Sequence, residues 1–477
     1  MRIHHEQNTK IVATVGPACQ DKEVLRSLIE AGVDIFRLNF SHGSHEVHKE
    51  NFQKISELNK EMGNHIGVLA DLQGPKLRVG TVQEGGIPLA PGDEIKFVGE
   101  ECIGDANKVY MRYEHFASDV QVGERVLCDD GKLVFEVLET DGSGVVRLKT
   151  IYGGILQSNK GVNLPDTSIS LPSLTEKDRA DLEVILTMPI DWIALSFVRE
   201  AAEIIELKEI IESKGHRAKV IAKIEKPQAI LNLKSIIKAT DAVMVARGDL
   251  GVEVPMEQVP TIQKDIIRRC IQKGRPVIVA TQMMESMMTA PSPSRAEITD
   301  VANAVLDGTD AVMLSGETSV GKHPVETVIA MNKIIYEAEQ HYQLKDKRPK
   351  ADRGSLTYYS DVVCYTASEM SEKIKAKAII GLTVSGYTAF KVSSYRPKTK
   401  IYIFSNSKRI LRTLNLVWGV SGFYYDKFTT TDGTIEDTIA ILKENKLIGP
   451  GDAVINTSSM PIEKRFTTNM IKVTIVE

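Results

Sequence analysis

The sequence predicts an α/β fold: a (β/α)8 TIM barrel with an inserted all-β lid domain and a C-terminal α/β domain. Eight short apolar runs of strand length alternate with helical patterns, which is typical of parallel strands joined by helices. The alternation is interrupted once by roughly a hundred residues of short, alternating, glycine-rich stretches. A charged, proline-containing segment then precedes a further α/β region. The strand count alone leaves an open doubly wound sheet as the alternative.

Three of the eight strands precede the interruption. They are the apolar runs Lys10–Pro17, Asp34–Ser41 and Ile66–Gln73, and amphipathic helical patterns at Glu23–Ala31 and Glu46–Met62 separate them. The remaining five follow the interruption, where Ser173 or Thr175 is the expected N-cap of the first helix. These five strands are Trp192–Val198, Val220–Glu225, Ala242–Asp249, Pro276–Thr281 and Ala311–Glu317.

The same boundaries predict three domains. Residues 1–75 and 173–343 are expected to form the catalytic barrel, and residues 76–172 the inserted β-barrel lid. Residues 344–477 repeat the strand–helix pattern after the charged segment and are expected to form a separate α/β regulatory domain.

Composition limits the possible partners and compartment. The 477 residues carry a formal net charge of −4, which gives no reason to expect a nucleic acid or an anionic membrane as partner. The five cysteines show no CxxC spacing, as is usual for proteins of a reducing compartment. The N-terminus lacks an apolar leader, and no run is long enough to span a membrane. We therefore expect a cytoplasmic protein.

Polar residues gather where the predicted strands end. In a barrel the carboxyl ends of all strands meet on one face, so these residues are expected to form one site. Two carboxylates suit Mg²⁺, and the accompanying arginine and lysine suit an anionic substrate, a combination that fits phosphoryl transfer. A rim of solvated salt bridges is the plainer alternative. The set comprises Arg37, Asn39, Ser41, Asp71, Lys223, Glu225, Arg247, Gly248, Asp249, Thr281, Ser315 and Glu317.

Several of these residues stand in motifs that resemble pyruvate kinases. The similar stretches run in the family's order and are longer than chance would give. They are FRLNFSHG at Phe36–Gly43, NKGVNLP at Asn159–Pro165, AKIEK at Ala222–Lys226, MVARGDLG at Met244–Gly251, VATQMMESM at Val279–Met287 and MLSGETSVGKHPVE at Met313–Glu326.

The resemblance implies transfer of the phosphoryl group of phosphoenolpyruvate to ADP, giving pyruvate and ATP, the final step of glycolysis. Carried over, Arg37 would hold the phosphate, and Lys223 would neutralise its charge in the transition state. Glu225 and Asp249 would bind Mg²⁺ or Mn²⁺. Backbone amides near Arg247, Gly248 and Asp249, with Thr281, would receive the substrate carboxylate. Thr281 and water near Ser315 and Glu317 would deliver the proton to the enolate.

The same resemblance extends to the other two domains. Arg78 and Lys160 would contact nucleotide phosphates, and Asp130 would approach the site when the lid closes. A strand–helix turn in the C-terminal domain carries Thr383, Ser385, Gly386 and Thr388, and is similar to the loop that binds phosphorylated activators in this family. A plain turn is the alternative there. The family is usually a homotetramer, and the same is expected of this chain.

One motif departs from the potassium-dependent members of the family. They carry a threonine, a lysine and a glutamate where this sequence has Leu72, Gln73 and Lys76. The hypothesis is that the Lys76 ammonium takes the place of K⁺ beside Asn39, Ser41 and Asp71, so that K⁺ is not required. An exposed lysine at a domain junction is the alternative.

A rival activity is that of a metal-dependent barrel aldolase acting on a pyruvate enolate, which uses similar carboxylates and an arginine. Such an enzyme would need neither the lid nor Lys223. The stretch Gly316–His323 also nearly matches a nucleotide-binding P-loop. There His323 replaces the hydroxyl residue that coordinates Mg²⁺, so this interpretation is not favoured.

Overall fold

The computed structural model describes residues 7–342, 348–349, 351–427, 430–460 and 467–477. Its centre is a closed barrel of eight parallel strands in the order β1-β17-β16-β15-β14-β13-β3-β2, which confirms the predicted barrel and excludes the open sheet. The predicted domain boundary at 343/344 lies outside the described residues. The barrel strands are β1 (Lys10–Thr14), β2 (Ile35–Asn39), β3 (Gly67–Asp71), β13 (Trp192–Leu195), β14 (Lys219–Ile224), β15 (Ala242–Ala246), β16 (Val277–Ala280) and β17 (Ala311–Leu314).

The strands stop earlier than the sequence suggested. The expectations that strands reach Asp249, Thr281 and Glu317 were wrong, because the chain leaves the sheet before each of these residues. Helix α8 (Arg247–Glu253) follows β15 directly, and α11 (Gly316–Ser319) follows β17 after one residue. Thr281 has a φ of +76°, which no strand residue adopts. Asp249 and Glu317 therefore lie in short helices above the barrel and Thr281 in the turn after β16, where their backbone groups are free of the ladder.

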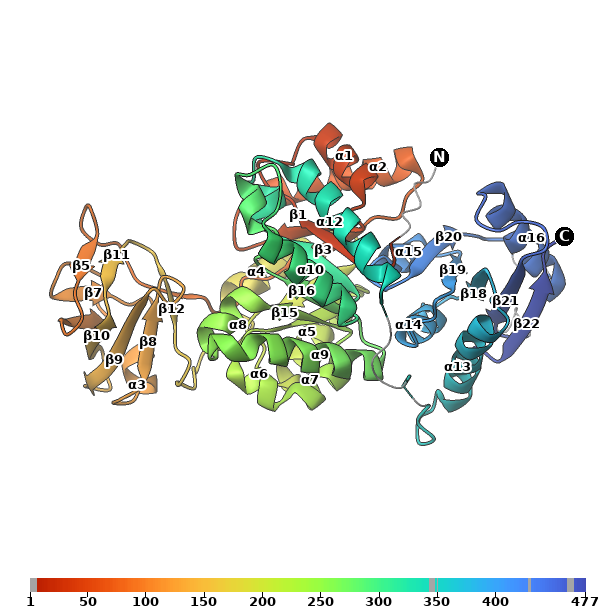
Figure 1. Ribbon diagram of the computed structural model, residues 1–477. Coiled ribbons are helices and arrows are strands. Elements are labelled where there is room, and N and C mark those ends of the chain that lie inside the picture. The colour runs from red at the N-terminus through yellow and green to blue at the C-terminus, as the bar shows by residue number, and fades with distance from the viewer. Residues whose placement is uncertain (1–6, 343–347, 350, 428–429, 461–466) are drawn as a thin grey trace.

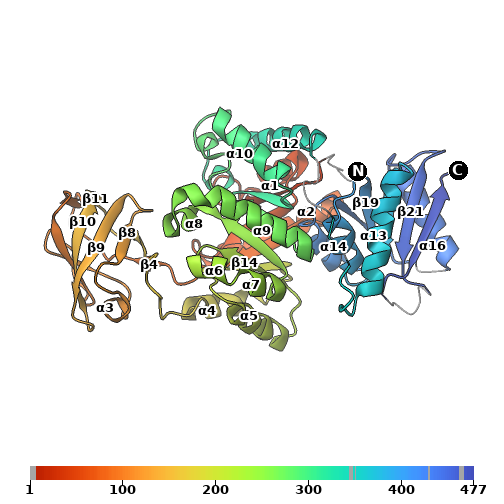
Figure 2. The same cartoon turned by 60° about the horizontal axis from the view of Figure 1, so that its bottom comes forward.

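Helices surround the barrel, as Figures 1 and 2 show. Of the two predicted N-caps, Thr175 is confirmed, because its side chain and that of Asp178 form a reciprocal capping box at α4. No helix of the described residues is long and apolar enough to cross a membrane. The surrounding helices are α1 (Lys22–Ala31), α2 (His45–Met62), α4 (Glu176–Ile185), α5 (Ala201–Ser213), α6 (Pro227–Leu231), α7 (Leu233–Ala239), α9 (Val259–Lys273), α10 (Arg295–Leu306) and α12 (Pro324–Gln340), with 3₁₀ turns η1 (Met256–Gln258) and η2 (Glu285–Met288).

The inserted segment forms its own β-rich domain, which Figure 1 shows projecting from one side of the barrel. A seven-stranded sheet has the order β4-β12-β8-β9-β10-β6-β7, and a two-stranded sheet pairs β11 with β5. One helical turn, α3 (Phe116–Asp119), departs from the all-β expectation. The strands are β4 (Leu77–Arg78), β5 (Ile87–Leu89), β6 (Glu94–Val98), β7 (Lys108–Tyr110), β8 (Arg125–Cys128), β9 (Leu133–Thr140), β10 (Val145–Tyr152), β11 (Gly154–Leu156) and β12 (Gly161–Asn163).

The C-terminal domain lies at the opposite end of the barrel from the insertion in both views (Figures 1 and 2). Its five-stranded sheet has the order β20-β19-β18-β21-β22, parallel except for the antiparallel edge strand β22. The strands are β18 (Ala378–Leu382), β19 (Lys400–Ser405), β20 (Val420–Tyr424), β21 (Ala453–Ser458) and β22 (Met470–Ile475). The helices are α13 (Tyr358–Lys373), α14 (Tyr387–Ser394), α15 (Lys408–Leu414) and α16 (Thr431–Glu444).

The C-terminal domain closes the floor of the barrel. Leu416 is fully buried in the apolar cluster that fills the barrel interior, together with Leu69 and Trp192. The Trp192 indole also donates a hydrogen bond to the Thr413 carbonyl at 3.3 Å. The two domains therefore share one core, so the barrel and the C-terminal domain are not independent units.

A buried ion pair of Arg396 stabilises this contact between the domains. Both terminal nitrogens of Arg396 reach the carboxylate of Asp310 at the entry to β17, at 2.9 and 3.2 Å. One also donates to the Gly308 carbonyl at 2.9 Å, and the guanidinium lies 5.0 Å from the centre of the Trp418 ring. Both partners of the ion pair are almost completely buried. A buried charge of this kind depends on its partner, because neither can be solvated alone.

Arg396→Met is therefore expected to lower the free energy of unfolding by about 3–5 kcal/mol, because Asp310 would be left buried and unpaired. Chemical denaturation followed by circular dichroism measures the change. Lys398→Met, two residues away at an exposed position, is the matched control and should change little. Equal stability of the two variants would contradict this account of the interdomain contact.

Candidate active site

The first part of the site is a pair of side chains on adjacent strands. Arg37 lies on β2 and Asp71 ends β3, and the two strands run side by side in register. The Arg37 Nε donates to Asp71 Oδ2 at 2.7 Å, and its Nη1 donates to the Thr14 hydroxyl at 3.1 Å. Thr14 ends β1, the strand next to β2, and is paired in register with Arg37. The guanidinium is thus held from both sides, which fixes where it can meet an anion.

Lys223, on β14, joins this pair to a second carboxylate. Its ammonium lies 3.4 Å from Asp71 Oδ1 and 3.0 Å from Glu225 Oε1. It also donates a hydrogen bond to the Ser196 hydroxyl at 2.7 Å, and Ser196 donates onward to the Leu72 carbonyl at 2.7 Å. The predicted convergence of Arg37, Asp71, Lys223 and Glu225 is therefore present as one continuous chain of charges.

Burial and mutual attraction set the protonation states of these charged side chains. Burial works against the charge of Lys223, but the carboxylates of Asp71 and Glu225 outweigh it and raise the lysine pKa above its usual value. Burial likewise opposes ionisation of Asp71, yet Lys223 and Arg37 together hold the Asp71 pKa below its usual range. Both groups are consequently charged at neutral pH, in a place where an isolated charge would not be stable.

Glu225 differs from Asp71 because burial and a neighbouring negative charge outweigh the positive charge near it. Burial raises the pKa of Glu225; Lys223 opposes the rise, and the nearby charge of Asp249 adds to it. One oxygen, Oε2, accepts the Phe197 amide at 2.6 Å. The other, Oε1, is buried and accepts no hydrogen bond from a described residue, although Lys223 lies at ion-pair distance. Glu225 and Asp249 are two neighbouring carboxylates, a donor set that suits a divalent cation.

Asp249 is the second of these carboxylates, in the first turn of α8. Its Oδ1 lies 3.2 Å from the ammonium of Lys76, on the segment that leads into the lid. The hypothesis placed Lys76 beside Asn39, Ser41 and Asp71, but the contact that the structure gives it is with Asp249. Asn39 instead accepts the Ser41 amide at 3.2 Å. Of the other two residues that mark the departure, Leu72 is buried and Gln73 is partly exposed.

Gly248 and Thr281 approach each other closely between β15 and β16. A Cβ atom on Gly248 would lie 2.7 Å from the Thr281 Cγ2, so only glycine fits there. The positive φ of Thr281 adds to the constraint, because a β-branched residue rarely adopts it. Strained residues of this kind are found mainly at functional sites, where neighbouring contacts hold them.

Arg247 supplies those contacts. Its guanidinium donates to the carbonyl oxygens of Ala280 at 3.3 Å and Thr281 at 2.8 Å. On its other side it pairs with Asp300, at 2.7 Å. The Arg247 side chain is therefore committed to holding the turn after β16, which makes it a positioning residue for Thr281.

Ser315 and Glu317 are joined by a similar backbone contact. The Glu317 carboxylate accepts the Ser315 amide at 2.7 Å and the Met284 amide at 3.1 Å. Glu317 is almost fully buried, and Ser315 is partly exposed. The carboxylate thus ties the turn after β16 to the turn after β17.

Of the lid residues predicted to bind nucleotide, Arg78 lies on β4 and Lys160 directly precedes β12. Arg78 in β4 faces Gly161 in β12, which brings Lys160 next to it. Arg78 donates to the Asn159 carbonyl at 3.0 Å, and Lys160 pairs with Asp129 at 2.7 Å. Asp129 is thus a partner that the sequence did not indicate. Asp130, the residue named from the resemblance, is exposed in the same turn.

His42 lies near positive charges from both the lid and the barrel. Burial lowers the pKa of His42, and the positive charges of Arg78, Arg37 and Lys76 lower it further. Cations from both domains therefore lie near one neutral imidazole. This residue and Ser196 are the additions that the structure makes to the predicted set. Their signal in the sequence was weak, because Ser196 lies within the expected strand Trp192–Val198 and His42 directly follows the expected strand Asp34–Ser41.

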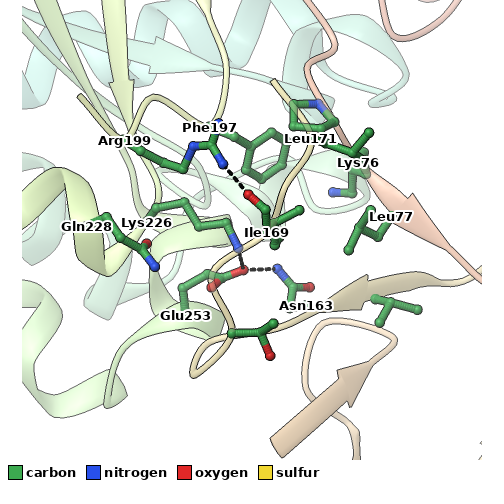
Figure 3. Close-up of a pocket in the computed structure, with 13 residues that line it drawn as sticks. Lys76, Leu77, Asn163, Ile169, Leu171, Phe197, Arg199, Lys226, Gln228 and Glu253 are labelled. Carbon is green, nitrogen blue, oxygen red and sulfur yellow. Dashed lines mark hydrogen bonds and ion pairs between the residues drawn. The ribbon is translucent and has the colours of Figure 1, made fainter. Parts of the chain in front are cut away.

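Figure 3 shows the junction on which the lid is mounted. Lys226 and Glu253 of the barrel form a buried ion pair of 2.7 Å, and Asn163 of the lid donates to the same Glu253 oxygen at 2.8 Å. Arg199 of the barrel donates to the Ile169 carbonyl at 2.5 Å, on the segment that returns from the lid. These contacts tie the returning connection of the lid to the top of the barrel.

The predicted effector turn lies at the junction of β18 and α14. Thr383 accepts the Gly386 amide at 2.9 Å, and Gly386 has a φ of +88° at the start of α14. Thr388 shares a hydrogen bond of 2.6 Å with Thr468. Ser385 remains exposed, so of the three hydroxyl groups only this one is open to solvent.

Two family models match the chain. "Pyruvate kinase, barrel domain" matches residues 6–328, and "Pyruvate kinase, alpha/beta domain" matches residues 361–474. Among the curated proteins, "Pyruvate kinase 2" of Synechocystis is 44% identical over 99% of this chain and 80% of its own length. "Pyruvate kinase" of Clostridium perfringens is 40% identical over 98% of this chain and 99% of its own length.

A solved structure agrees with these matches. The crystal structure of a pyruvate kinase from Cryptosporidium parvum superposes with a TM-score of 0.92 at 34% sequence identity, and covers 99% of this chain and 96% of that one. The likeness includes the barrel, the inserted domain and the C-terminal domain together. With the converging charges of Arg37, Asp71, Lys223 and Glu225 at the strand ends, it leads to one conclusion: this chain belongs to the pyruvate kinase family.

Proposed function

We propose that the charge chain Asp71–Lys223–Glu225, with Arg37, is the catalytic centre that transfers the phosphoryl group of phosphoenolpyruvate to ADP. The observation that carries the assignment is the position of Lys223, whose buried ammonium stays charged between two carboxylates. Charge develops on the phosphoryl oxygens in such a transfer, and a fixed cation in a water-poor site stabilises it strongly. Glycolysis is the pathway that this reaction completes.

Arg37 is assigned to hold the phosphate before transfer. Its contacts to Asp71 and Thr14 fix the guanidinium plane, while the remaining nitrogen, Nη2, forms no hydrogen bond with a described residue. A preorganised guanidinium binds phosphate oxygens with little loss of side-chain freedom. Lys223 is assigned to the negative charge that develops on the phosphoryl group during transfer. Both cations are thus assigned to contacts with the substrate.

Glu225 and Asp249 fit a divalent cation, and Mg²⁺ or Mn²⁺ is the proposed ion. The fit rests on the buried Glu225 oxygen that lacks a hydrogen bond and on the raised Glu225 pKa. Among the described residues, no group of three or more His, Cys, Asp or Glu side chains converges. Two carboxylates suit Mg²⁺, which keeps positions for water and substrate oxygens. When bound, the ion would supply positive charge to the substrate's phosphate and enolate oxygens.

The remaining barrel residues are assigned to binding and to the proton. Backbone amides at Gly248 and Asp249, with Thr281, are proposed to receive the substrate carboxylate. The Thr281 hydroxyl, and water held near Ser315 and Glu317, are proposed to pass a proton to the enolate. The anchored Thr281 backbone supports this assignment, because a proton donor must be held at a defined distance. Arg247 acts on the substrate only through that anchor.

Closure of the lid is proposed to complete the nucleotide site. Arg78 and Lys160 are assigned to the phosphates of ADP and ATP, and Asp130 is expected to move toward the barrel with them. The charge of Arg78, which lies near His42 of the barrel, supports the assignment of Arg78. Residues 76–172 are proposed to move as one body about the junction of Lys226, Glu253 and Asn163.

K⁺ independence is a further proposal, based on Lys76. Its ammonium lies at the mouth of the site, 3.2 Å from Asp249, so a permanent cation is present there. We infer that lid movement brings this ammonium to Asn39, Ser41 and Asp71 in the catalytic state, where it replaces the monovalent ion. Its place on the segment that enters the lid allows such a shift.

Other features stay proposals for this chain. They are a homotetrameric assembly, a cytoplasmic location, the domain limits given above, and a phosphorylated effector at Thr383, Ser385, Gly386 and Thr388. The free state of its five cysteines agrees with a reducing compartment. The aldolase alternative is not supported, because the matching relatives are pyruvate kinases over nearly the whole chain.

Lys223→Met should reduce kcat by about a hundredfold to a thousandfold, because one fixed charge that meets the transition state is removed. Phosphoenolpyruvate binding, measured by calorimetry in the presence of Mg²⁺, should survive. ADP-dependent pyruvate release is followed in a coupled assay, with the exposed Lys214→Met as control. Near-normal turnover in a correctly folded Lys223→Met protein would overturn the assignment.

Gly248→Ala should lower kcat/KM by about a hundredfold, because the added Cβ must push Thr281 out of place. Thr281→Ser removes the clashing methyl group and keeps the hydroxyl. The double variant Gly248→Ala with Thr281→Ser should therefore recover activity relative to Gly248→Ala alone. Failure of this rescue in folded protein would show that the Gly248–Thr281 approach is not what the alanine disturbs.

The rate should change little when K⁺ is replaced by Na⁺ or tetramethylammonium, because Lys76 already provides the cation. Lys76→Glu should instead make the rate depend on K⁺, since it restores the residue type of the potassium-dependent members. Initial rates at fixed ionic strength measure both. A large loss of rate in the unmodified protein without K⁺ would refute the hypothesis.

A further inference from the structure

One buried carboxylate of the barrel contacts both the lid and the segment that carries a proposed metal ligand. Glu253 is the last residue of α8, and its side chain is fully buried. A single oxygen, Oε1, accepts hydrogen bonds from the Lys226 ammonium at 2.7 Å and from the Asn163 side-chain amide at 2.8 Å. Figure 3 shows the three side chains meeting at that oxygen. A buried carboxylate is stable only while such partners are held in place.

Lys226 connects Glu253 to the first proposed metal ligand. It directly follows Glu225 in the chain and is the N-cap residue of α6. Lys226 is itself buried, so its ammonium depends on Glu253 for a counter-charge. The backbone that carries Glu225 is therefore anchored on its far side by this ion pair.

Helix α8 connects Glu253 to the second proposed metal ligand. Asp249 lies four residues before Glu253, so the two carboxylates stand one turn apart on the same side of the helix. A helix of 7 residues has little stability of its own, and its place depends on contacts with other segments. The lid and its connection supply such contacts at both ends, because Lys76 pairs with Asp249 at 3.2 Å and Asn163 donates to Glu253. The position of Asp249 thus depends on how the lid is attached.

Asn163 connects the same carboxylate to the proposed nucleotide contacts of the lid. It ends β12, which pairs with β4 at Gly161 and Arg78, and Lys160 directly precedes this strand. Arg78, Lys160 and Asn163 therefore belong to one pair of strands. A change in the direction of β12 would move the two cations and disturb the contact with Glu253 together.

Glu253 also lines a small cavity at the junction of lid and barrel. The cavity has a volume of about 20 Å³, which is enough for one water molecule. Glu253 Oε2 and Gln228 Oε1 are both buried and accept no hydrogen bond from a described residue. Both residues line the cavity, so one water in it would donate to both oxygens. The direct contacts of the carboxylate with the lid and with Lys226 are therefore those of Oε1 alone.

We propose that Glu253 is a positioning residue of the catalytic centre, and that through it the affinity of the metal site depends on the attachment of the lid. Glu253 holds Asp249 through α8 and Glu225 through Lys226, and Asn163 joins the lid to the same oxygen. This role rests on the proposed function, in which Glu225 and Asp249 bind the divalent ion. Residues that orient metal ligands from behind commonly change metal affinity by about tenfold or more.

Asn163→Ala tests this role, because it removes only the contact from the lid and leaves the Lys226–Glu253 ion pair intact. Mn²⁺ binding to the whole chain is measured by electron paramagnetic resonance in the absence of substrates. The dissociation constant for Mn²⁺ should rise about threefold to tenfold. A contact that only stabilised the lid would leave the Mn²⁺ affinity unchanged. Asn107→Ala, at an exposed position of the lid, is the matched control and should bind Mn²⁺ as the parent does.

An exchange of the two partners tests the carboxylate itself. Glu253→Gln alone leaves Lys226 buried without a counter-charge, and should weaken Mn²⁺ binding by about tenfold or more. Glu253→Gln combined with Asn163→Asp exchanges donor and acceptor and keeps one negative charge near Lys226. The double variant should recover Mn²⁺ affinity to within about threefold of the parent, because the two sites are in contact and their effects are not additive. Circular dichroism checks that each variant is folded.

Two results would overturn the proposal. One is a Mn²⁺ affinity of folded Asn163→Ala equal to that of Asn107→Ala. The other is a double variant that binds Mn²⁺ no more tightly than Glu253→Gln alone. A failure of the proposed function is distinguishable from both, because Mn²⁺ binding would then be unchanged by Glu225→Gln, which removes a proposed ligand. That result would overturn the metal site and, with it, the positioning role of Glu253.

Discussion

The buried ion pairs of Lys223 are the interaction on which the catalytic face depends. An ammonium in this position is tolerated only because Asp71 and Glu225 surround it, and those carboxylates are tolerated only because of Lys223 and Arg37. Four strands of the barrel, β2, β3, β13 and β14, must therefore end in register for the charges to meet. The barrel supplies that register through its closed hydrogen-bond ladder, so fold and chemistry are set by the same geometry.

Around this centre, the turns above the barrel are held by backbone contacts from charged side chains. Arg247 binds carbonyl groups of the turn after β16, and Glu317 binds amides on two turns. In a sequence these residues resemble ligands, because they are charged and stand beside the catalytic motifs. In the structure their hydrogen bonds are used to hold Thr281 and its neighbours. The positions of the site residues thus depend on a second set of charged side chains, whose hydrogen bonds go to the protein backbone.

The sequence was sufficient for the architecture and for the central residues. Apolar strands of regular spacing predicted the barrel, and polar residues after them predicted Arg37, Asp71, Lys223 and Glu225 as one site. It could not give the ends of strands, because the turn at Thr281 depends on a positive φ imposed by tertiary contacts. It also could not give the partner of Lys76 or the role of Ser196, since both depend on contacts between distant segments.

The burial of Leu416 in the barrel interior has a consequence for how this architecture can be modified. The C-terminal domain contributes an apolar side chain to the barrel's own interior, in contact with the layer that contains Trp192 and Leu69. Removing that domain would open the barrel at its base and expose apolar surface to water. A form shortened by truncation before this domain is therefore expected to be less stable than the whole chain. The part of the chain farthest from the chemistry is a structural component of the barrel that performs it.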